Sequence, residues 1–512
     1  MSLLSPGSSL TVRTSWLVAA KTAAFAFTIA IPLLLVRRMP QHEFGLYKQV
    51  FLIVNSAVSM LPLGFGLTAF YFLPREEDRL RRNQTVFNVV LFTAAVSSLF
   101  AAVLSLFPAI LILLFNEPAV VGFAPWIGLI IVLWVVGSFL EIVTVANHDI
   151  RLATAAILAI QVSRATFFLT AALVAGSVRA LVFAAVVQGL LQVSLLVLYL
   201  TSRFPGFWAS FDLSFLRRQL AYSLPFGAAG LMYSLQTDLH NYFVSHQFGA
   251  AIFAVYAIGC FQLPFFGILA ESVGSVMIPR VSLLQHQQRT REIVLLTTGV
   301  MRKLAGVYFP AYAFLMIMRY EFITALFTAR YIASVPVFAV NLTLIPLGIF
   351  MTDPIMRAYA EHRHFVLKVH ATLLVCLTIG LWLSVGRFGL LGAITLVVVC
   401  NALGRAATLM KVVRILDVRP RDIALLADIG KIAGAAAAAG LASTLVRSLA
   451  SGLPPIAVLF VCAACFGITY VTAGLVLGIA TREERAFVLN HLWRAIGRSS
   501  APLGQPVTLV RD

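Results

Sequence analysis

Long runs of apolar residues follow one another along most of the chain. About fourteen such runs, most of them near twenty residues long, lie between Ser15 and Ala480, with short polar connections between them. A hydrocarbon core of about 30 Å needs about 20 helical residues to cross it. The pattern predicts an all-α, polytopic membrane protein with about fourteen spans, at 15–36, 44–67, 86–114, 123–146, 153–176, 180–201, 220–248, 251–278, 301–319, 332–356, 365–385, 389–411, 428–449 and 455–480.

Composition supports the membrane prediction and excludes most enzyme classes. Hydrophobic residues make up 60% of the 512 residues and charged residues 11%, whereas soluble proteins carry about 25% charged residues. No connection is long enough to fold as a soluble catalytic domain, and the phosphate-binding sequence Gly-x-x-x-x-Gly-Lys-Ser/Thr is absent. We expect a protein that is not an enzyme, with no catalytic residues, no metal site and no cofactor.

The net charge of +18 is explained by topology rather than by nucleic-acid binding. With the N-terminus inside, the inner connections hold about 27 Lys and Arg residues and the outer ones about 8. This imbalance predicts a multi-pass protein of the cell inner (cytoplasmic) membrane with both termini in the cytoplasm. We expect membrane lipid as a partner and no nucleic acid.

A weak internal repeat divides the chain. Phe44-x-x-Tyr47 opens the second predicted span, and Phe253-x-x-Tyr256 opens the eighth, about 209 residues later. The second span is followed by Pro74-Arg75, and the eighth ends at Pro279-Arg280. An offset of six spans preserves orientation and predicts two parallel six-helix bundles around a central cavity, as in transporters. The predicted parts are a bundle at 1–211, a bundle at 212–420, two additional spans at 421–480 and a cytoplasmic tail at 481–512.

Ionisable residues inside the predicted spans are the candidate site, because charge in a bilayer is costly and usually faces a cavity or a partner. Ser234, Asp238, Asn241 and Ser245 recur at intervals of four, three and four, which places them on one face of the seventh span. The other candidates, with polar residues on the same helix faces, are Lys21, Glu141, Arg164, Glu271 and Arg405.

Two interpretations of these charges are open. They line a cavity, which we favour for Lys21, Asp238 and Arg164, or they pair across helices and fix the packing. Glu141, Glu271 and Arg405 lie nearer the inner ends, where either interpretation fits. Pairing is favoured for Asp353, since Arg357 follows four residues later.

Short motifs in a matching order resemble the Wzx-type polysaccharide flippases. The first set is Glu43-Phe44-Gly45-Leu46-Tyr47 with Leu73-Pro74-Arg75. A second set is Tyr222-Ser223-Leu224-Pro225-Phe226-Gly227, then Tyr256-Ala257-Ile258-Gly259 and Ile278-Pro279-Arg280. The segment from Glu321-Phe322-Ile323 to Tyr331 is also similar. The likeness covers the chain to about residue 411, and the number of spans extends it to about 480.

The resemblance implies a flippase of the multidrug, oligosaccharidyl-lipid and polysaccharide exporter superfamily. Such a protein moves undecaprenyl-diphosphate-linked oligosaccharide across the cytoplasmic membrane by alternating access, for O-antigen, capsule or exopolysaccharide synthesis. Polysaccharide polymerase and chain-length proteins are the implied partners. A diphosphate headgroup needs cations, so Lys21 and Arg164 are the expected diphosphate contacts. Asn241 and Arg405 are further expected substrate contacts.

The intramembrane charges also include acids, which departs from the cationic lumen of that family. Asp238, Glu271 and Glu141 are therefore candidates to carry a proton or a sodium ion in exchange. Three alternatives stay open: a drug or metabolite exporter of the same superfamily, a flippase for the peptidoglycan lipid precursor, and, from another class, a membrane glycosyl polymerase or ligase. The last would need a large outer loop with catalytic acids, which this chain lacks.

Overall fold

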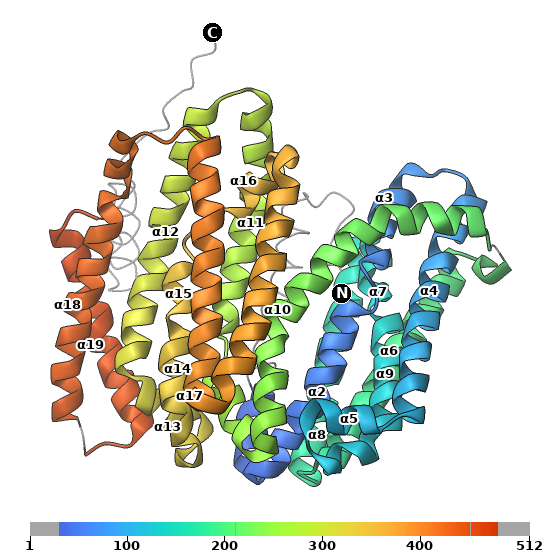
Figure 1. The fold of residues 1–512 in the computed structure, drawn as a ribbon, viewed down its shortest axis with the longest axis horizontal. Coiled ribbons are helices and arrows are strands. Elements are labelled where there is room, and N and C mark those ends of the chain that lie inside the picture. The colour runs from blue at the N-terminus through green and yellow to red at the C-terminus, as the bar shows by residue number, and fades with distance from the viewer. Residues whose placement is uncertain (1–29, 210, 451, 480–512) are drawn as a thin grey trace, which may run out of the picture.

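The structure is a computed structural model that describes residues 30–209, 211–450 and 452–479. Helices, without any β-strand, make up the ordered elements of these ranges (Figure 1). Residues 30–38 form the first described helix. The further helices are α2 (Gln41–Met60), α3 (Thr68–Phe72), α4 (Arg79–Leu106), α5 (Ala109–Phe115), α6 (Ala124–Gly137), α7 (Phe139–Ala146), α8 (Ile150–Val174), α9 (Val178–Arg203), α10 (Leu213–Gly259), α11 (Pro264–His286), α12 (Thr290–Ile317), α13 (Arg319–Phe327), α14 (Val335–Leu342), α15 (Leu344–Leu347), α16 (Asp353–Ala358), α17 (Arg363–Ile415), α18 (Ala427–Leu449) and α19 (Pro455–Val476).

The described residues include eleven helices long and apolar enough to cross a membrane, or twelve if one bent pair forms a single span. Many of their apolar side chains are not covered by protein. In Pro264–His286 and Pro455–Val476 only 17% of the most apolar window is buried. The remaining apolar surface requires an apolar solvent, so this is a multi-pass membrane protein. The predicted number of fourteen stays a prediction, because most of the first span lies outside the described residues.

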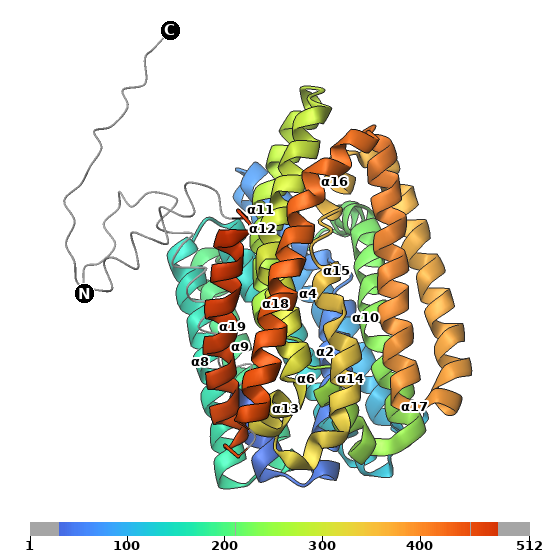
Figure 2. The same ribbon diagram turned by 90° about the vertical axis from the view of Figure 1, so that its left-hand side faces the viewer.

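Two of the long helices are hairpins that reverse at a glycine. In α17, Gly389 has φ +61°, and across this turn Gly380 packs on Leu396 and Gly404 on Leu373, so two antiparallel helices lie side by side (Figure 2). In α10 the turn is at Gly249, with φ +73°. Positive φ is readily available only to glycine. The predicted span boundaries at 385/389 and 248/251 fall at these turns.

The second predicted span is broken in the structure. Helix α2 ends at Met60, Leu63 and Gly64 have positive φ, and the segment Phe65–Arg75 continues at 40° to α2. The eighth predicted span is also interrupted, between Gly259 and Pro264. Continuous helices had been expected at both places. Unwound backbone inside a membrane protein is tolerated where protein covers it.

The helices form two groups that lie side by side. Residues 30–209, the N-terminal group, are blue to teal in Figure 1, and residues 211–479, the C-terminal group, run from green to red, with α10 between them. We call the end bearing α3, α16 and the start of α10 the basic end, and the end bearing α5 and α13 the opposite end. The largest buried apolar cluster joins α2, α6 and α9 to Ala254, Tyr331 and Phe338 of the C-terminal group.

Candidate functional site

Helices α2 and α10 bring the two groups into backbone contact at two glycines. A Cβ on Gly45 would lie 1.8 Å from the carbonyl oxygen of Ala250, and a Cβ on Gly227 would lie 2.0 Å from that of Leu63. Neither place has room for a side chain. Small residues allow helices to approach closely in membranes, where the hydrophobic effect does not drive helices together.

Between these glycines two side-chain hydrogen bonds cross from α2 to α10. Gln49 Nε2 donates to Ser245 Oγ at 2.8 Å, and Ser56 Oγ donates to Asp238 Oδ2 at 2.7 Å. The residue numbers of the partners on α10 fall as those on α2 rise, so the two helices are antiparallel. We call this contact, from Gly45–Ala250 to Leu63–Gly227, the seam.

Two polar residues of the stripe on the seventh predicted span, Asp238 and Ser245, lie in the seam and contact α2. Ser245 is fully buried against α2, as the cross-helix pairing interpretation expects, while Asp238 is half-buried. Asn241 is half-buried on the same helix, and the ring of the neighbouring Tyr242 stacks on Phe115 of the N-terminal group at 5.7 Å between centroids. Asp238 is therefore an acid at the contact between the two groups.

Further contacts join the groups at the opposite end. Arg37 Nη2 donates to the carbonyl oxygen of Ala325 at 2.8 Å, and Arg330 Nη1 donates to that of Met39 at 3.1 Å. The ring of Phe44 meets that of Tyr331 edge-on. The residues in each of these contacts are between 287 and 291 positions apart in the chain. The structure is thus a state in which the two groups are closed together at the opposite end.

Arg164 of α8 lies inside the N-terminal group. Its guanidinium carbon is 4.1 Å from the centroid of the Trp134 ring, a cation–π contact that reaches about 2 kcal/mol or more when water is excluded. No carboxylate of the described residues lies within ion-pair distance of it, and its Nε has no hydrogen-bond partner there. Arg164 is thus a partly buried cation without an anionic partner among the described residues.

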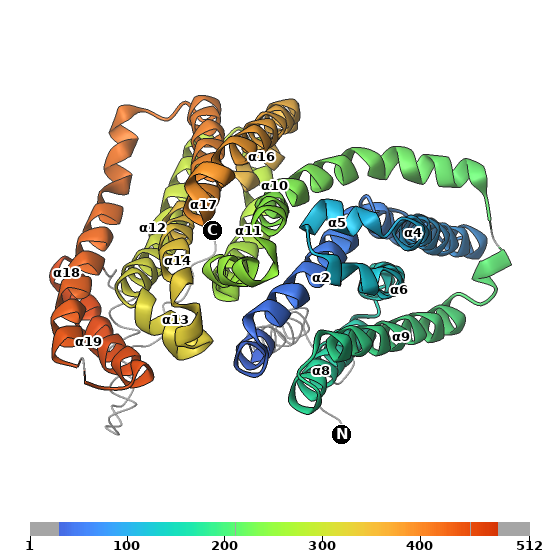
Figure 3. The ribbon, with the colours of Figure 1, turned by 60° about the horizontal axis from the view of Figure 1, so that its bottom comes forward.

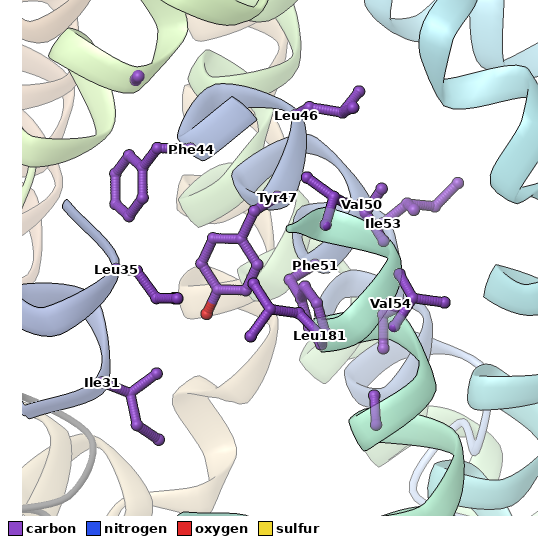
Figure 4. Packing of buried hydrophobic residues seen from close by; sticks show 14 of the residues in the cluster. Ile31, Leu35, Phe44, Leu46, Tyr47, Val50, Phe51, Ile53, Val54 and Leu181 are labelled. Carbon is purple, nitrogen blue, oxygen red and sulfur yellow. The ribbon is translucent and has the colours of Figure 1, made fainter. Parts of the chain in front are cut away.

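Next to this cation, the apolar core of the N-terminal group surrounds Tyr47 and Phe51. Figure 4 shows both rings between α2, the helix 30–38, which contributes Ile31 and Leu35, and α9, which contributes Leu181. The ring of Phe51 contacts that of Trp134 at 6.0 Å between centroids. These apolar neighbours hold the Trp134 ring against the guanidinium of Arg164.

Lys48 is a second cation that sequence reasoning missed. It lies within the second predicted span but was not named among the candidates, and since α2 begins at Gln41, Lys48 lies two turns inside the helix. Its Nζ is 5.5 Å from the ring centroid of Phe44 and 5.9 Å from that of Tyr47. The spacing of four residues between Phe44 and Lys48 was the available signal, because such residues share a helix face.

The remaining candidates do not converge on one point. Arg405 of α17 donates weakly, at 3.4 Å, to the carbonyl oxygen of Phe350 in the C-terminal group. Glu141 of α7 and Glu271 of α11 have exposed side chains. Lys21 lies outside the described residues. The expected pair of Asp353 and Arg357 is confirmed, with 2.8 Å between Nε and Oδ2.

A cavity of about 190 Å³ lies beside the break of the second span, within the N-terminal group. Three hydroxyl side chains line it, from Ser59, Thr93 and Ser138, together with apolar residues and the glycines at the break. Gly227 of the seam packs against Leu63 of the same break. The unwound backbone at the end of α2 therefore borders both a partly polar space and the contact between the groups.

Solved structures with this fold are transporters and a flippase. The lipid II flippase MurJ, in an inward closed conformation, is similar at a TM-score of 0.71 with 11% identity, over 94% of this chain and 99% of that one. An inward-facing multidrug resistance MATE family transporter of the MOP superfamily has a TM-score of 0.58 with 14% identity, over 77% and 94%. A MOP superfamily transporter from Pyrococcus furiosus has a TM-score of 0.53 with 14% identity, over 79% of this chain and 95% of that one.

The fold is therefore that of the MurJ and MATE transporters of the MOP superfamily. At the level of sequence, the profile of the family described as "Polysaccharide biosynthesis protein" matches residues 34–336. Since this is more than half of the chain, the protein belongs to that family. Comparison with curated protein sequences gives no match.

Proposed function

We propose that this protein translocates an undecaprenyl-diphosphate-linked oligosaccharide across the cytoplasmic membrane by alternating access, for the synthesis of a surface polysaccharide. The observation that carries the proposal is the family match to residues 34–336 in a chain that shares its fold with a lipid II flippase over nearly its whole length. The product of polysaccharide biosynthesis lies outside the cell, so a step that moves a lipid-linked sugar is required.

Arg164 supplies the chemistry that the headgroup needs. A diphosphate must leave water to cross the hydrocarbon, and a charge-assisted hydrogen bond from a guanidinium offsets that cost. In the present state the Trp134 ring occupies the face of this guanidinium, and its Nε has no hydrogen-bond partner among the described residues. With Lys21, Lys48, Asn241 and Arg405 it would form a set of polar groups along the path, while the polyprenyl tail stays in lipid.

The seam supplies the gate. We propose that the basic end faces the cytoplasm, that both termini lie there, and that the opposite end is the external one. The contacts of Arg37, Phe44 and Arg330 then close the external side, and transport requires them and the seam to open. Asp238, and with it Glu271 or Glu141, would carry a proton or sodium ion whose different affinity for the two states biases this equilibrium. Polysaccharide polymerase and chain-length proteins are the proposed partners.

A second candidate is a flippase for the peptidoglycan lipid precursor, favoured by the likeness to MurJ. Both substrates share the undecaprenyl diphosphate and differ in the sugar. A drug exporter is the third candidate, supported by the fold shared with the MATE transporter. Its substrates carry no lipid-linked diphosphate, so this candidate gives no role to a partly buried arginine without an ion-pair partner.

Flipping by the purified full-length protein in proteoliposomes tests the proposal. Fluorescent undecaprenyl-diphosphate-linked oligosaccharide, lipid II and a cationic drug are assayed in parallel. We expect flipping of the first well above that of protein-free vesicles. Flipping of lipid II alone, or transport of the drug alone, would assign the protein to the corresponding rival, and no movement of any of the three would overturn the proposal.

Variants of Arg164 test the site in the same assay. We expect Arg164→Ala to reduce flipping to the protein-free background and Arg164→Lys to retain part of it, because a lysine keeps the charge but loses the bidentate geometry. The matched control is Arg179→Ala, at an exposed arginine near the opposite end, which should flip like wild type. Normal flipping by Arg164→Ala, at normal thermal stability, would remove Arg164 from the site.

A further inference from the structure

Two ion pairs occupy matching positions in the two groups of helices. Arg81, near the start of α4, pairs with Asp212, at 2.9 Å between Nη1 and Oδ2. Arg291, near the start of α12, pairs with Asp422. In each pair the partners are 131 residues apart, and each member of the second pair lies 210 residues after its counterpart. This offset is close to the 209 residues of the sequence repeat.

The surroundings of the two pairs match as well. Helices α4 and α12 both have 28 residues. The acid of each pair begins a similar stretch of sequence, Asp212-Leu213-Ser214-Phe215-Leu216 at the start of α10 and Asp422-Ile423-Ala424-Leu425-Leu426 just before α18. By position, α18 therefore corresponds to α10. The first pair fastens the start of α10 to α4 of the N-terminal group, and the second fastens the segment before α18 to α12 of the C-terminal group.

After the pairs the two helices take different paths. Helix α18 packs along α12 within the C-terminal group, whereas α10 leaves α4 and packs on α2 and on α17. In Figure 3 α10 arches from the N-terminal group across to the C-terminal group. Pro225 lies inside α10, and 210 residues later α18 has Ala435. A proline removes a helix hydrogen bond and causes a kink, so this position allows α10 to bend where α18 does not.

The first turns of α10 are attached to the N-terminal group by several contacts around Asp212. The guanidinium of Arg81 also lies over the Phe215 ring, at 5.5 Å. Asn88 Nδ2 donates to Gln219 Oε1 at 2.9 Å, and the rings of Phe72 and Phe215 meet edge-on. All of these residues precede Pro225. The segment of α10 beyond Pro225 instead forms the seam.

We propose that Arg81 and Asp212 are a pivot, which holds the start of α10 on the N-terminal group in both states of the transport cycle while the helix bends at Pro225. The proposal rests on alternating access as the proposed function. Its counterpart, Arg291 with Asp422, holds α18 to a helix of the same group and so does not cross between parts that move. The two pairs have the same construction and different roles, which makes one the internal control of the other.

The charge of the pivot does not change at physiological pH. Hydrogen bonds from the Ser214 hydroxyl and the Phe215 backbone N–H, and from Arg81, lower the pKa of Asp212 to about 2. A depressed carboxyl pKa keeps its stabilising effect above the unfolded value of about 4 and loses it as the pH falls toward the folded value. The effects of substitutions at the pair should thus be the same at pH 6 and pH 8.

Charge reversal at both pairs, read out by distance as well as by transport, tests the pivot. Spin labels are placed at Glu77 and Gln287, which are exposed on the two groups near the basic end, in a full-length background without its native cysteines. One set of variants is Arg81→Asp, Asp212→Arg and both together. The matched set is Arg291→Asp, Asp422→Arg and both together. Label distances, flipping and thermal stability are measured for each.

We expect two label distances in wild type. In each single variant of the Arg81 set we expect one broad distribution of label distances and flipping reduced about tenfold or more, because like charges placed together repel strongly. The double variant of that set should restore both distances. The single variants of the Arg291 set should lower thermal stability and keep the two distances.

If the single variants of the Arg81 set and of the Arg291 set lost the two label distances equally, both ion pairs would serve only to stabilise the fold, and the pivot would be overturned. The pivot would also be overturned if the variants of the Arg81 set kept both label distances, or if the double variant of that set did not restore them. A wild type with one distance under all conditions, with and without substrate, would overturn alternating access and the pivot with it. The failure of the pivot alone is therefore distinct from that of the proposed function.

Discussion

Gly45→Ala should open the seam between the two groups. The added Cβ would lie 1.8 Å from the carbonyl oxygen of Ala250, where ordinary contact begins at 3.4 Å. The obstacle is backbone on both sides, so no side chain can rotate away. Helices α2 and α10 must separate at this point by roughly 1.6 Å, the difference between these two distances, or lose the closed state.

The cost of this substitution can be estimated from its surroundings. Overpacking of one methyl group typically costs about 1–3 kcal/mol. The hydrogen bond between Gln49 and Ser245, 2.8 Å long and one turn away, would stretch with the helices. Since the clash exists only while the seam is closed, the substitution raises the free energy of the closed state and not that of a state with the seam open. A bias of about 1–3 kcal/mol shifts an equilibrium about 5- to 150-fold.

Accessibility of a cysteine at position 245 measures the shift. Ser245 is fully buried in the seam, so Ser245→Cys reacts with a membrane-impermeant maleimide only when the seam parts. We expect Gly45→Ala to raise the reaction rate by about 5- to 150-fold, in line with the estimated bias. Gly227→Ala, which clashes with the carbonyl of Leu63, should act in the same direction.

Gly299→Ala is the matched control, since a Cβ on this glycine of α12 meets no atom within 4 Å. Its reaction rate should equal that of wild type. An unchanged rate for both Gly45→Ala and Gly227→Ala, at unchanged thermal stability, would refute the close approach of the two helices. A raised rate for all three would mean that the cysteine reports general loosening and not the seam.

Two further predictions concern coupling and orientation. Asp238→Asn can still accept the hydrogen bond of Ser56 but cannot hold a proton or a cation, so we expect flipping in proteoliposomes that no longer follows an imposed proton or sodium gradient. An Asn variant that still follows the gradient would move the coupling role to Glu271. Reporter fusions should be external after Gly249 and cytoplasmic after Arg82, Arg218, Arg291 and Arg421; an external reporter at Arg82 or Arg218 would reverse the proposed orientation.

Much of the helix layout could be predicted from the sequence, because the length of an apolar run and the glycine that ends it are local properties. The boundaries expected at 248/251 and 385/389 fall at Gly249 and Gly389, where only a glycine readily reverses the chain. The polar face of the seventh span was also readable, since spacing along a helix fixes which side chains share a face. The break after Met60 was not predicted from the sequence, although Pro62 and Gly64 lie at this place.

The tertiary structure decided what these faces meet. The spacing of Asp238 and Ser245 indicates one face of a helix, but only packing reveals that this face lies on Ser56 and Gln49 of α2. Likewise, nothing near Arg164 in the sequence indicates Trp134 as its neighbour. The physical reason is that lipid solvates every apolar helix face about equally well, so partners are chosen by shape and hydrogen bonds between helices remote in sequence. Where the helices run and which faces are polar follow from local sequence, whereas the packing selects which polar groups close the contact between the two groups.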